Sequence, residues 1–310
     1  MHFGASMFCT DYSMTPAELG PTLEERGFES FWAPEHSHIP TSRISPWGGG
    51  PELPKRYYDV IDPFVGLGAM SSVTKTLKLA TGVCLIIQRD PIQLAKEVAT
   101  LDYLSGGRFL FGIGAGWNRE EMADHGTNPK TRIALMAERV AMLKTIWTEA
   151  KPVFKGEFQS FEPMMTWPKP VQKPHPPIWV GGETKPARRR AGQVGDGWYP
   201  VGNNPTSPYD TVARFSKGLA DMRGYAETAD RDPSSIEIGL NVIWFRMDEI
   251  YENEDGDRMP FTGSDAAIID DIGAYETAGL NHLVINLEGD DLQLSLDRLD
   301  AFAERIMTKT

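Results

Sequence analysis

Short apolar runs alternate with segments of helical periodicity along the whole chain. The apolar runs predict buried strands, and the amphipathic segments predict the helices that cover them. The predicted strands span residues 2–9, 29–33, 77–87, 108–114, 177–181, 197–201, 236–246 and 282–287. The predicted helices span residues 16–26, 63–73, 91–104, 131–148, 186–194, 209–227, 265–278 and 292–307. The chain is therefore predicted to contain eight strand-then-helix units in succession.

Eight such units are typical of a single (β/α)8 TIM barrel, whereas six units with a central split would favour a doubly wound sheet. We therefore predict one α/β barrel domain over residues 1–310. Three segments interrupt the alternation, at about 34–58, 151–176 and 247–263, and we predict insertion loops at the C-terminal face of the barrel. Because active sites of such barrels lie at the carboxyl ends of the strands, the candidate residues are sought there.

The composition limits the partners of the protein. The 31 Lys and Arg residues against 43 Asp and Glu residues leave a net charge of −12, which disfavours nucleic acid and anionic membranes as partners. No apolar run approaches the length of a membrane span, and the first residues lack the basic region of a signal peptide. Cys9 and Cys84 both lie in apolar stretches, which is typical of a reducing compartment. We expect a cytoplasmic protein whose partner is a small molecule.

The second predicted strand ends in a group of ionisable residues, Glu35-His36-Ser37-His38. An imidazole titrates near neutral pH, so His36 is a candidate for proton transfer. His36 and His38 also have the spacing of a metal-binding pair, which would make a metal-dependent barrel hydrolase an alternative. Such a site needs further ligands at later strand ends, and those ends offer at most Glu288. We therefore predict no metal site.

The fourth predicted strand ends in Gly114-Ala115-Gly116, a loop with almost no side chains. Such a loop lets a flat or anionic ligand lie against backbone N–H groups. The glycine spacing does not match a dinucleotide fingerprint, and we predict a loop rather than a helix over residues 118–126. Within the third predicted strand, Gly82 is compatible either with a bulge against a ligand or with simple barrel packing.

The fifth predicted strand ends in Gly181-Gly182-Glu183-Thr184, directly before a predicted helix. Free N–H groups and the positive end of a helix dipole make such a loop a phosphate-binding site. Thr184 equally fits an ordinary N-cap with Pro186 in the first turn, so both interpretations stay open. The residues 188–190 are all Arg and lie about 100° apart on the helix, so at most one or two can face a ligand.

These strand ends, in this order, resemble the bacterial luciferase-like monooxygenase superfamily, and specifically its coenzyme F420-dependent (deazaflavin) oxidoreductases. The resemblance spans nearly the whole chain, from Phe3 to about Ala303, and is most specific from Ala95 to Glu121. The segments that carry it are ESFWAPEH, LATGV, DPIQLAKEVATLDYLSGGRFLFGIGAGWNREE, PPIWVGGETKPARRRAGQVGDGWYP and AGLNHLVINL. Members often form homodimers, so the resemblance also implies a homodimer.

The resemblance implies a flavin or deazaflavin ring in the barrel mouth and assigns roles to individual residues. Glu35 and His36 match an acidic-His pair whose His lies beside the ring or the substrate as acid or base. Gly82 and Val83 match a non-prolyl cis peptide that bulges behind the ring. The residues that match the loop contacting the ring and its side chain, and then the phosphate-binding site, are Ala115, Gly116, Asn118, Gly181, Gly182, Glu183 and Thr184.

Two positions depart from the patterns of the superfamily. Ala115 stands where the luciferases carry a phosphate-binding Arg, which disfavours luciferase-type FMN chemistry. Trp117 stands where a deazaflavin-dependent sugar-phosphate dehydrogenase carries a catalytic Glu, which argues against that particular activity. The resemblance therefore favours coenzyme F420 as the cofactor, with FMN as the alternative.

We predict that a reduced deazaflavin delivers hydride to an unsaturated or carbonyl-type organic substrate. His36 would move the accompanying proton, and Glu35 would orient His36. Trp47, Trp117 and the aromatic residues of the 151–176 insertion are expected to line an apolar substrate site. The alternatives are an FMN-dependent monooxygenase that uses O2, the metal-dependent hydrolase, and a binding-only protein that holds a flavin without turnover.

Overall fold

The computed structural model describes residues 1–50, 52–204, 207–253 and 255–310. Residues 51 and 254, which belong to two of the predicted insertions, lie outside the described residues. The chain divides into two compact units. The first unit comprises Met1–Met7, Gly20–Trp32 and Ile178–Thr310, and the second comprises Phe8–Leu19 and Ala33–Pro177.

The first unit contains a parallel sheet whose strands follow the order β2-β1-β13-β10-β9-β8. The strands are β1 (His2–Ser6), β2 (Ser30–Ala33), β8 (Ile178–Gly181), β9 (Gly197–Tyr199), β10 (Glu237–Val242) and β13 (His282–Ile285). Side chains of alternate residues form an aromatic core, in which the Trp32 ring stacks on Tyr199 at 4.2 Å and meets Trp179 edge-on. These strands are buried except at their ends, where His2 and Glu237 are exposed and Gly181 is half-buried, as the apolar runs predicted.

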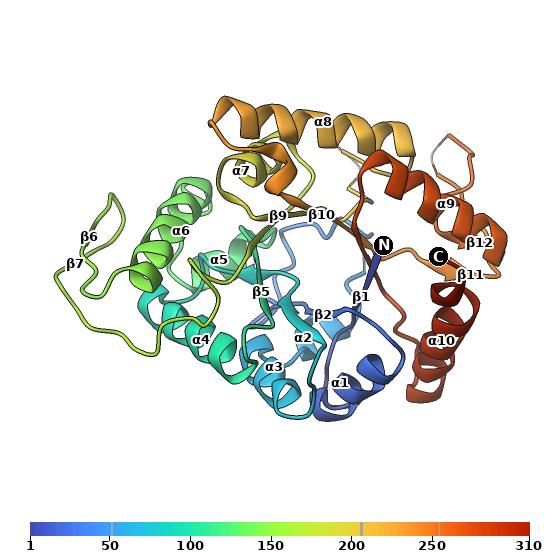
Figure 1. Ribbon diagram of the computed structural model, residues 1–310, viewed down its shortest axis with the longest axis horizontal. Coiled ribbons are helices and arrows are strands. Elements are labelled where there is room, and N and C mark those ends of the chain that lie inside the picture. The colour runs from blue at the N-terminus through green and yellow to red at the C-terminus, as the bar shows by residue number, and fades with distance from the viewer. Residues whose placement is uncertain (51, 205–206, 254) are drawn as a thin grey trace. The chain divides into compact units, whose positions relative to one another are not determined.

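Helices follow the strands of the first unit as the periodicity predicted. They are α7 (Lys185–Val194), α8 (Val212–Thr228), α9 (Asp265–Ala278) and α10 (Leu292–Arg305), with 3₁₀ turns at Pro233–Ser235 and Met307–Lys309. Helix α7 packs against α8 (Figure 1). Ser264 caps α9 by accepting a hydrogen bond from Ala267 N, and Gly279 ends the helix in the left-handed conformation that glycine adopts most readily. A small parallel pair, β11 (Arg246–Met247) and β12 (Thr262–Gly263), brackets the third predicted insertion.

In the second unit, β3 (Lys78–Thr81) and β4 (Cys84–Leu85) both pair in parallel with β5 (Phe109–Gly114). A single strand was predicted over residues 77–87, and the structure instead divides it at Gly82–Val83. The peptide bond between Gly82 and Val83 is cis, as the resemblance implied.

The helices of the second unit are α2 (Arg56–Asp59), α3 (Pro63–Ser71), α4 (Pro91–Leu104), α5 (Arg119–Asp124) and α6 (Arg132–Thr148), while α1 (Pro16–Glu25) runs from the second unit into the first. Asp62 and Asp90 cap α3 and α4, each followed by a proline at the first helical position. The 151–176 insertion forms a small antiparallel hairpin of β6 (Phe154–Lys155) and β7 (Ser160–Phe161), beyond α6 in Figure 1. Among the described residues, no helix combines the length and apolar character that crossing a membrane requires.

Candidate active site

His36 is the centre of a hydrogen-bonded group in the second unit, and its side chain is only 6% exposed. Its Nδ1 lies 2.9 Å from Oε2 of Glu121, and its Nε2 lies 3.3 Å from the indole Nε1 of Trp117. An indole N–H can only donate, so Nε2 of His36 accepts, and the ring proton must be on Nδ1. This geometry describes a neutral imidazole that donates to a carboxylate and keeps a lone pair on Nε2.

Glu121 lies on α5, a helix that the sequence analysis missed when it predicted a loop over residues 118–126. Asn118 caps this helix by accepting a hydrogen bond from Glu121 N at 3.2 Å, and acidic residues at 120 and 121 suit the positive end of the helix dipole. The side chain of Glu121 is 1% exposed, and its Oε1 also accepts a hydrogen bond from Ser37 N at 3.2 Å. Glu121 therefore fixes both His36 and the chain that follows it.

Glu35 does not orient His36, and that prediction was wrong. Its Oε2 accepts a hydrogen bond from Leu85 N at 2.6 Å, and its Oε1 accepts one from Arg89 Nε at 2.6 Å. Arg89 also pairs with Asp62 and Glu97. Burial alone would lower the pKa of Arg89, but the facing carboxylates, Glu35 foremost, raise it above its ordinary value. Glu35 therefore holds β4 in place through its hydrogen bond from Leu85 N. Glu121 is the carboxylate that orients His36, a role that the sequence analysis assigned to Glu35.

Aromatic rings surround His36 within the second unit. The Trp117 ring stands edge-on to the imidazole at 5.6 Å, and the Tyr57 ring lies at 5.7 Å. Trp47 meets Tyr57 edge-on at 5.4 Å. Trp47 and Trp117 thus both belong to the aromatic surroundings of His36, as the expectation of an apolar substrate site requires.

The contacts described for aromatic residues of the 151–176 insertion lie within its hairpin or on α6, so the expected contribution to the substrate site stays a prediction. Phe154 stacks on Phe161 within the hairpin at 6.1 Å, and the backbone N–H of Phe158 donates to the carboxylate of Glu138 on α6. Trp167 is 60% exposed. A short hairpin of limited apolar content packs on the nearest helix, and local periodicity cannot show which helix that is.

The glycine loop after β5 leaves little room for side chains at two of its positions. Gly116 has φ +70°, and a Cβ there would lie 3.1 Å from Cε of Met122, so a larger residue would be both strained and crowded. A Cβ on Gly114 would lie 2.6 Å from Cγ2 of Val83. The Nε2 amide of Gln88 lies 3.8 Å from the Cβ position of Gly116 and is buried without a hydrogen-bond partner in the described part of the chain. A buried donor beside a bare loop fits a ligand that brings an acceptor.

His38 lies apart from this group. Its Nε2 lies 3.0 Å from Oδ2 of Asp124, and its Nδ1 lies 2.9 Å from Oγ of Ser37, which also lies 2.6 Å from Nε2 of His125. The side chains of His38 and Asp124 are 40% and 61% exposed, so this is a solvated surface network. Within the described ranges, no group of three or more His, Cys, Asp or Glu residues has metal-binding geometry.

The predicted phosphate-binding loop lies in the first unit, between β8 and α7. Gly182 has φ +107°, and its carbonyl oxygen accepts a hydrogen bond from Trp198 Nε1 at 3.0 Å. Thr184 occupies the N-cap position of α7, but its hydroxyl makes no capping hydrogen bond. Arg188 is engaged, because it donates to the carbonyl of Glu183 and pairs with Asp221. The hydroxyl of Thr184 is therefore not used in ordinary capping, and this loop stays a candidate for anion binding.

The carboxylate of Glu183 is satisfied by donors of the protein itself, including the backbone N–H of Glu183. Its carboxylate accepts hydrogen bonds from Val201 N and, at 3.2 Å, from Asn204 Nδ2. Burial raises the pKa of Glu183 to about 7, although these hydrogen bonds act in the opposite direction. Glu183 therefore joins the loop after β8 to the loop after β9.

The raised pKa of Glu183 predicts a pH-dependent stability. The folded state holds this proton more tightly than the unfolded chain, whose carboxyl titrates near 4.5, so the contribution is complete below that pH and is lost as the pH rises through about 7. Glu183→Gln should therefore reduce the loss of unfolding free energy between pH 5 and pH 8 by about 1–3 kcal/mol, measured by urea denaturation. A pH dependence identical to that of the natural protein would contradict this assignment.

The hydrogen bond from His36 to Glu121 predicts a kinetic effect of the carboxylate. Glu121→Gln keeps an acceptor for Nδ1 of His36 but removes the negative charge that would stabilise a protonated His36. The kcat of a reaction in which His36 moves a proton should therefore fall by about 10–100-fold. Asp124→Asn, on the same helix but exposed, is the matched control and should change kcat less than about twofold. Equal effects of the two substitutions on kcat would show that the pair has no special role.

Comparison with known proteins identifies the family. The family model for luciferase-like monooxygenases matches residues 16–249, most of the chain. The chain belongs to the luciferase-like monooxygenase family, whose characterised members among the relatives below are flavin- or F420-dependent oxidoreductases.

Three relatives illustrate the range of the family. An uncharacterized protein of Mycobacterium tuberculosis is 43% identical over 202 residues, which cover 64% of this chain and 71% of that protein. An FMNH2-dependent dimethylsulfone monooxygenase of Pseudomonas putida is 33% identical over 183 residues, covering 58% of this chain and 47% of the enzyme. An F420-dependent glucose-6-phosphate dehydrogenase of Kineococcus radiotolerans is 29% identical over 231 residues, covering 73% and 62%.

Solved structures confirm the fold class. A monooxygenase from Streptomyces bottropensis superposes with a TM-score of 0.78 at 20% identity, covering 100% of this chain and 99% of that one. The F420-dependent tetrahydromethanopterin reductase from Methanopyrus kandleri also gives 0.78, at 15% identity and 99% coverage of both chains. The chain therefore has the (β/α)8 barrel fold that the eight strand–helix units predicted.

Proposed function

We propose that this protein is a coenzyme F420-dependent oxidoreductase that transfers hydride between the deazaflavin and a small organic substrate. The observation that carries the proposal is the buried His36–Glu121 pair, which leaves a lone pair on Nε2 of His36. Hydride transfer to or from an oxygen-bearing carbon needs a proton acceptor or donor at that oxygen. His36 would be the catalytic residue, and Glu121 the residue that positions it.

The residues of the second unit would face the reactive ring. The loop Gly114–Gly116 has almost no side chains, and the orphaned amide of Gln88 fits a carbonyl or hydroxyl of the bound cofactor. Val83, next to Gly114, would contact the ring, as the resemblance implies. Asn118 is used as a helix cap, so its proposed contribution is to hold the loop rather than to contact a phosphate.

In the first unit, considered by itself, the loop between β8 and α7 would bind a phosphate group. Thr184 offers a hydroxyl that is not used in capping, and the first turn of α7 offers the N–H groups of Lys185 and Ala187, since Pro186 has none and Arg188 N bonds to Thr184 O. Gly181 and Gly182 bring the backbone close, while Glu183 holds the loop. Asn241 on β10 has a buried side-chain oxygen without a hydrogen-bond partner among the described residues, which fits a ligand donor.

When bound, the reduced deazaflavin supplies the hydride. The protein's own contribution is to fix the substrate against the ring, to exclude water by its aromatic surroundings, and to move one proton at Nε2 of His36. In the resting geometry Trp117 occupies that nitrogen, so the oxygen of the substrate must take the place of the Trp117 N–H.

The choice between the two cofactors rests on Ala115. The relatives include both FMNH2- and F420-dependent enzymes, so family membership alone does not decide. An alanine offers no charge to an FMN phosphate, and Arg188 on the phosphate-binding helix is engaged by Asp221 and Glu183. FMN with O2 is the second candidate, because the P. putida relative uses reduced FMN.

A side-by-side fluorescence titration tests the cofactor. Purified protein should bind coenzyme F420 at least about tenfold more tightly than FMN, which is about 1.4 kcal/mol. Thr184→Val should weaken the binding of either cofactor, while Thr211→Val, a capping threonine of α8, should not. Tight binding of FMN without binding of F420 would refute the cofactor assignment.

The buried thiols of Cys9 and Cys84 form no disulfide, in keeping with the proposed reducing cytoplasm.

A further inference from the structure

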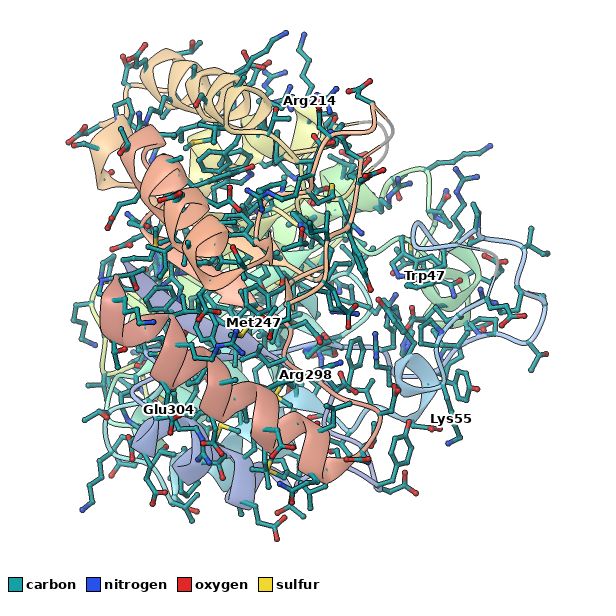
Figure 2. All side chains as sticks on the ribbon, turned by 90° about the vertical axis from the view of Figure 1, so that its right-hand side faces the viewer. Trp47, Lys55, Arg214, Met247, Arg298 and Glu304 are labelled. Carbon is teal, nitrogen blue, oxygen red and sulfur yellow. The ribbon has the colours of Figure 1, made fainter. Side chains whose placement is uncertain are left out.

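One segment of the second unit, residues 37–58, carries two of the aromatic rings near His36. We propose that Tyr57 and Trp47 are the specificity-determining residues of the His36 site and select a substrate that presents an apolar group. This inference rests on the proposed function, because it assigns the substrate class of the same site. Figure 2 labels Trp47 and Lys55 on this segment, on the right of the view.

Ser45 fastens the segment to the start of α5. Ser45 is 7% exposed, although its neighbour Ile44 is 78% exposed. Its backbone N–H donates to Oε1 of Glu120 at 2.8 Å, its hydroxyl donates to Oε2, and the hydroxyl accepts from Arg119 N at 3.0 Å. The hydrogen bonds from Ser45 lower the pKa of Glu120, so this contact is made by a charged carboxylate.

The same helix turn therefore holds the segment at two points. Glu121 binds His36 and Ser37 at its beginning, and the adjacent Glu120 binds Ser45 near its middle. The stretch from Ser37 to Ser45 is therefore fixed at both ends, and Trp47 follows it two residues later, while Tyr57 is held separately on α2. Without the contact at Ser45, this stretch would sample many conformations.

The fixed segment presents rings rather than polar groups. Tyr57 lies between the rings of His36, Trp47 and Phe8, at 5.7, 5.4 and 4.7 Å. The Trp47 ring lies over Gly49, where a Cβ would come within 2.4 Å of it. Aromatic faces and edges favour apolar groups of a ligand and provide area at low cost in conformational entropy.

Nearby charges disfavour an anionic substrate. Arg89 is committed to Glu35, Asp62 and Glu97, and Lys55 pairs with Asp59. The buried Glu121 would therefore repel an anion, and neither Arg89 nor Lys55 is free to compensate. Arg43 is the exception, because its Nη1 is buried without a partner in the described part of the chain, and it is the group that an anionic substrate would use.

Ligand-observed NMR on the purified full chain tests the substrate class without turnover. Acetophenone, an apolar ketone, should show saturation transfer, and glucose 6-phosphate should not. Tyr57→Ala and Gly49→Ala, which displaces the Trp47 ring, should each raise the Kd for acetophenone about 3–10-fold, while Tyr57→Phe should leave it unchanged. The Kd for F420, measured in the same samples, should be the same in all of these variants.

The contact at Ser45 has its own readout. Ser45→Ala should increase hydrogen–deuterium exchange of the backbone over residues 39–50 by about fivefold, and it should raise the Kd for acetophenone. Ser42→Ala is the matched control on the same segment, since Ser42 is exposed. Unchanged exchange in Ser45→Ala would show that Ser45 does not hold the rings in place.

Two results would overturn the inference. One is the absence of saturation transfer to acetophenone, or a Kd for it that does not respond to Tyr57→Ala. The other is tighter binding of glucose 6-phosphate that is lost in Arg43→Gln. Failure of the natural protein to bind F420 would instead refute the proposed function, and the selectivity of the apo protein for acetophenone would still decide the substrate class.

Discussion

Replacing His36 with alanine is expected to lower kcat for the hydride-transfer reaction by about 10²–10⁴-fold. The substitution removes an imidazole that is buried, has a carboxylate partner, and carries a lone pair that accepts from Trp117 in this structure. Binding of the cofactor should change little, because the hydrogen bonds of His36 go to Glu121 and Trp117 rather than to the glycine loop. Stopped-flow measurement of the deazaflavin absorbance separates the transfer step from binding.

His38→Ala is the matched control, because His38 lies two residues away but belongs to the exposed network with Asp124. It should leave the transfer rate within about threefold of the natural protein. If both substitutions slow the transfer equally, the loop as a whole matters and the imidazole of His36 has no chemical role. If neither does, a different residue moves the proton.

Replacing Arg89 with methionine is expected to lower the free energy of unfolding by about 3–5 kcal/mol. The guanidinium pairs with Glu35, Asp62 and Glu97, and the side chain of Glu35 is only 7% exposed. Methionine matches the length of the stem but leaves the buried carboxylate of Glu35 facing only neutral donors among the described residues, the N–H of Leu85 and the thiol of Cys84. Urea denaturation at pH 7 measures the loss.

The double variant Arg89→Met with Glu35→Gln distinguishes the effect of leaving the Glu35 charge unpaired from the effect of losing the packing of the Arg89 side chain. A neutral amide at position 35 no longer needs the cation, so the double variant should recover about 1–3 kcal/mol of the loss. Arg119→Met, at an exposed side chain, should cost less than about 0.5 kcal/mol. A double variant less stable than Arg89→Met alone would contradict the view that Glu35 is buried for the sake of this ion pair.

The fold could be predicted from the sequence because its signals are local and repeated. The Asp-Pro pairs at 62–63 and 90–91 start helices where the periodicity placed them, and α4 and α9 have the predicted bounds. Ends were less accurate, since the predicted strand over residues 2–9 stops at Ser6. Residues just beyond a strand can be as apolar and buried as the strand itself, as Met7 and Phe8 are.

Helix α5 was missed, although the sequence contains a signal for it. Asn118 followed three residues later by Glu121 is the spacing of a helix N-terminus, and the structure uses Asn118 in this way. A helix of six residues is too short to show a periodic apolar face, so the glycines and polar residues around it predicted a loop. The N-cap residue Asn118 indicated this helix, and the periodicity of apolar residues did not.

The partners within the site could not be predicted, because they depend on contacts far apart in the sequence. Glu35 adjoins His36 along the chain, and Glu121 lies 85 residues away, yet only Glu121 bonds to the imidazole. Adjacent residues after a strand point in different directions, so chain proximity misled the assignment. Gln88 and Ser45 carry no sequence signal at all. Gln88 is identified in the structure by its buried amide without a hydrogen-bond partner among the described residues. Ser45 is identified by the burial of its side chain beside an exposed neighbour.

The most direct measurement is a crystal structure of the protein with coenzyme F420. The account predicts the deazaflavin ring beside Val83 and the Gly114–Gly116 loop, with the amide of Gln88 hydrogen-bonded to it. It also predicts that Nε2 of His36 faces the reactive carbon of the ring across the space for a substrate, and that Nδ1 stays bonded to Glu121. A bound ring that contacts neither Gly116 nor the surroundings of His36 would contradict the account.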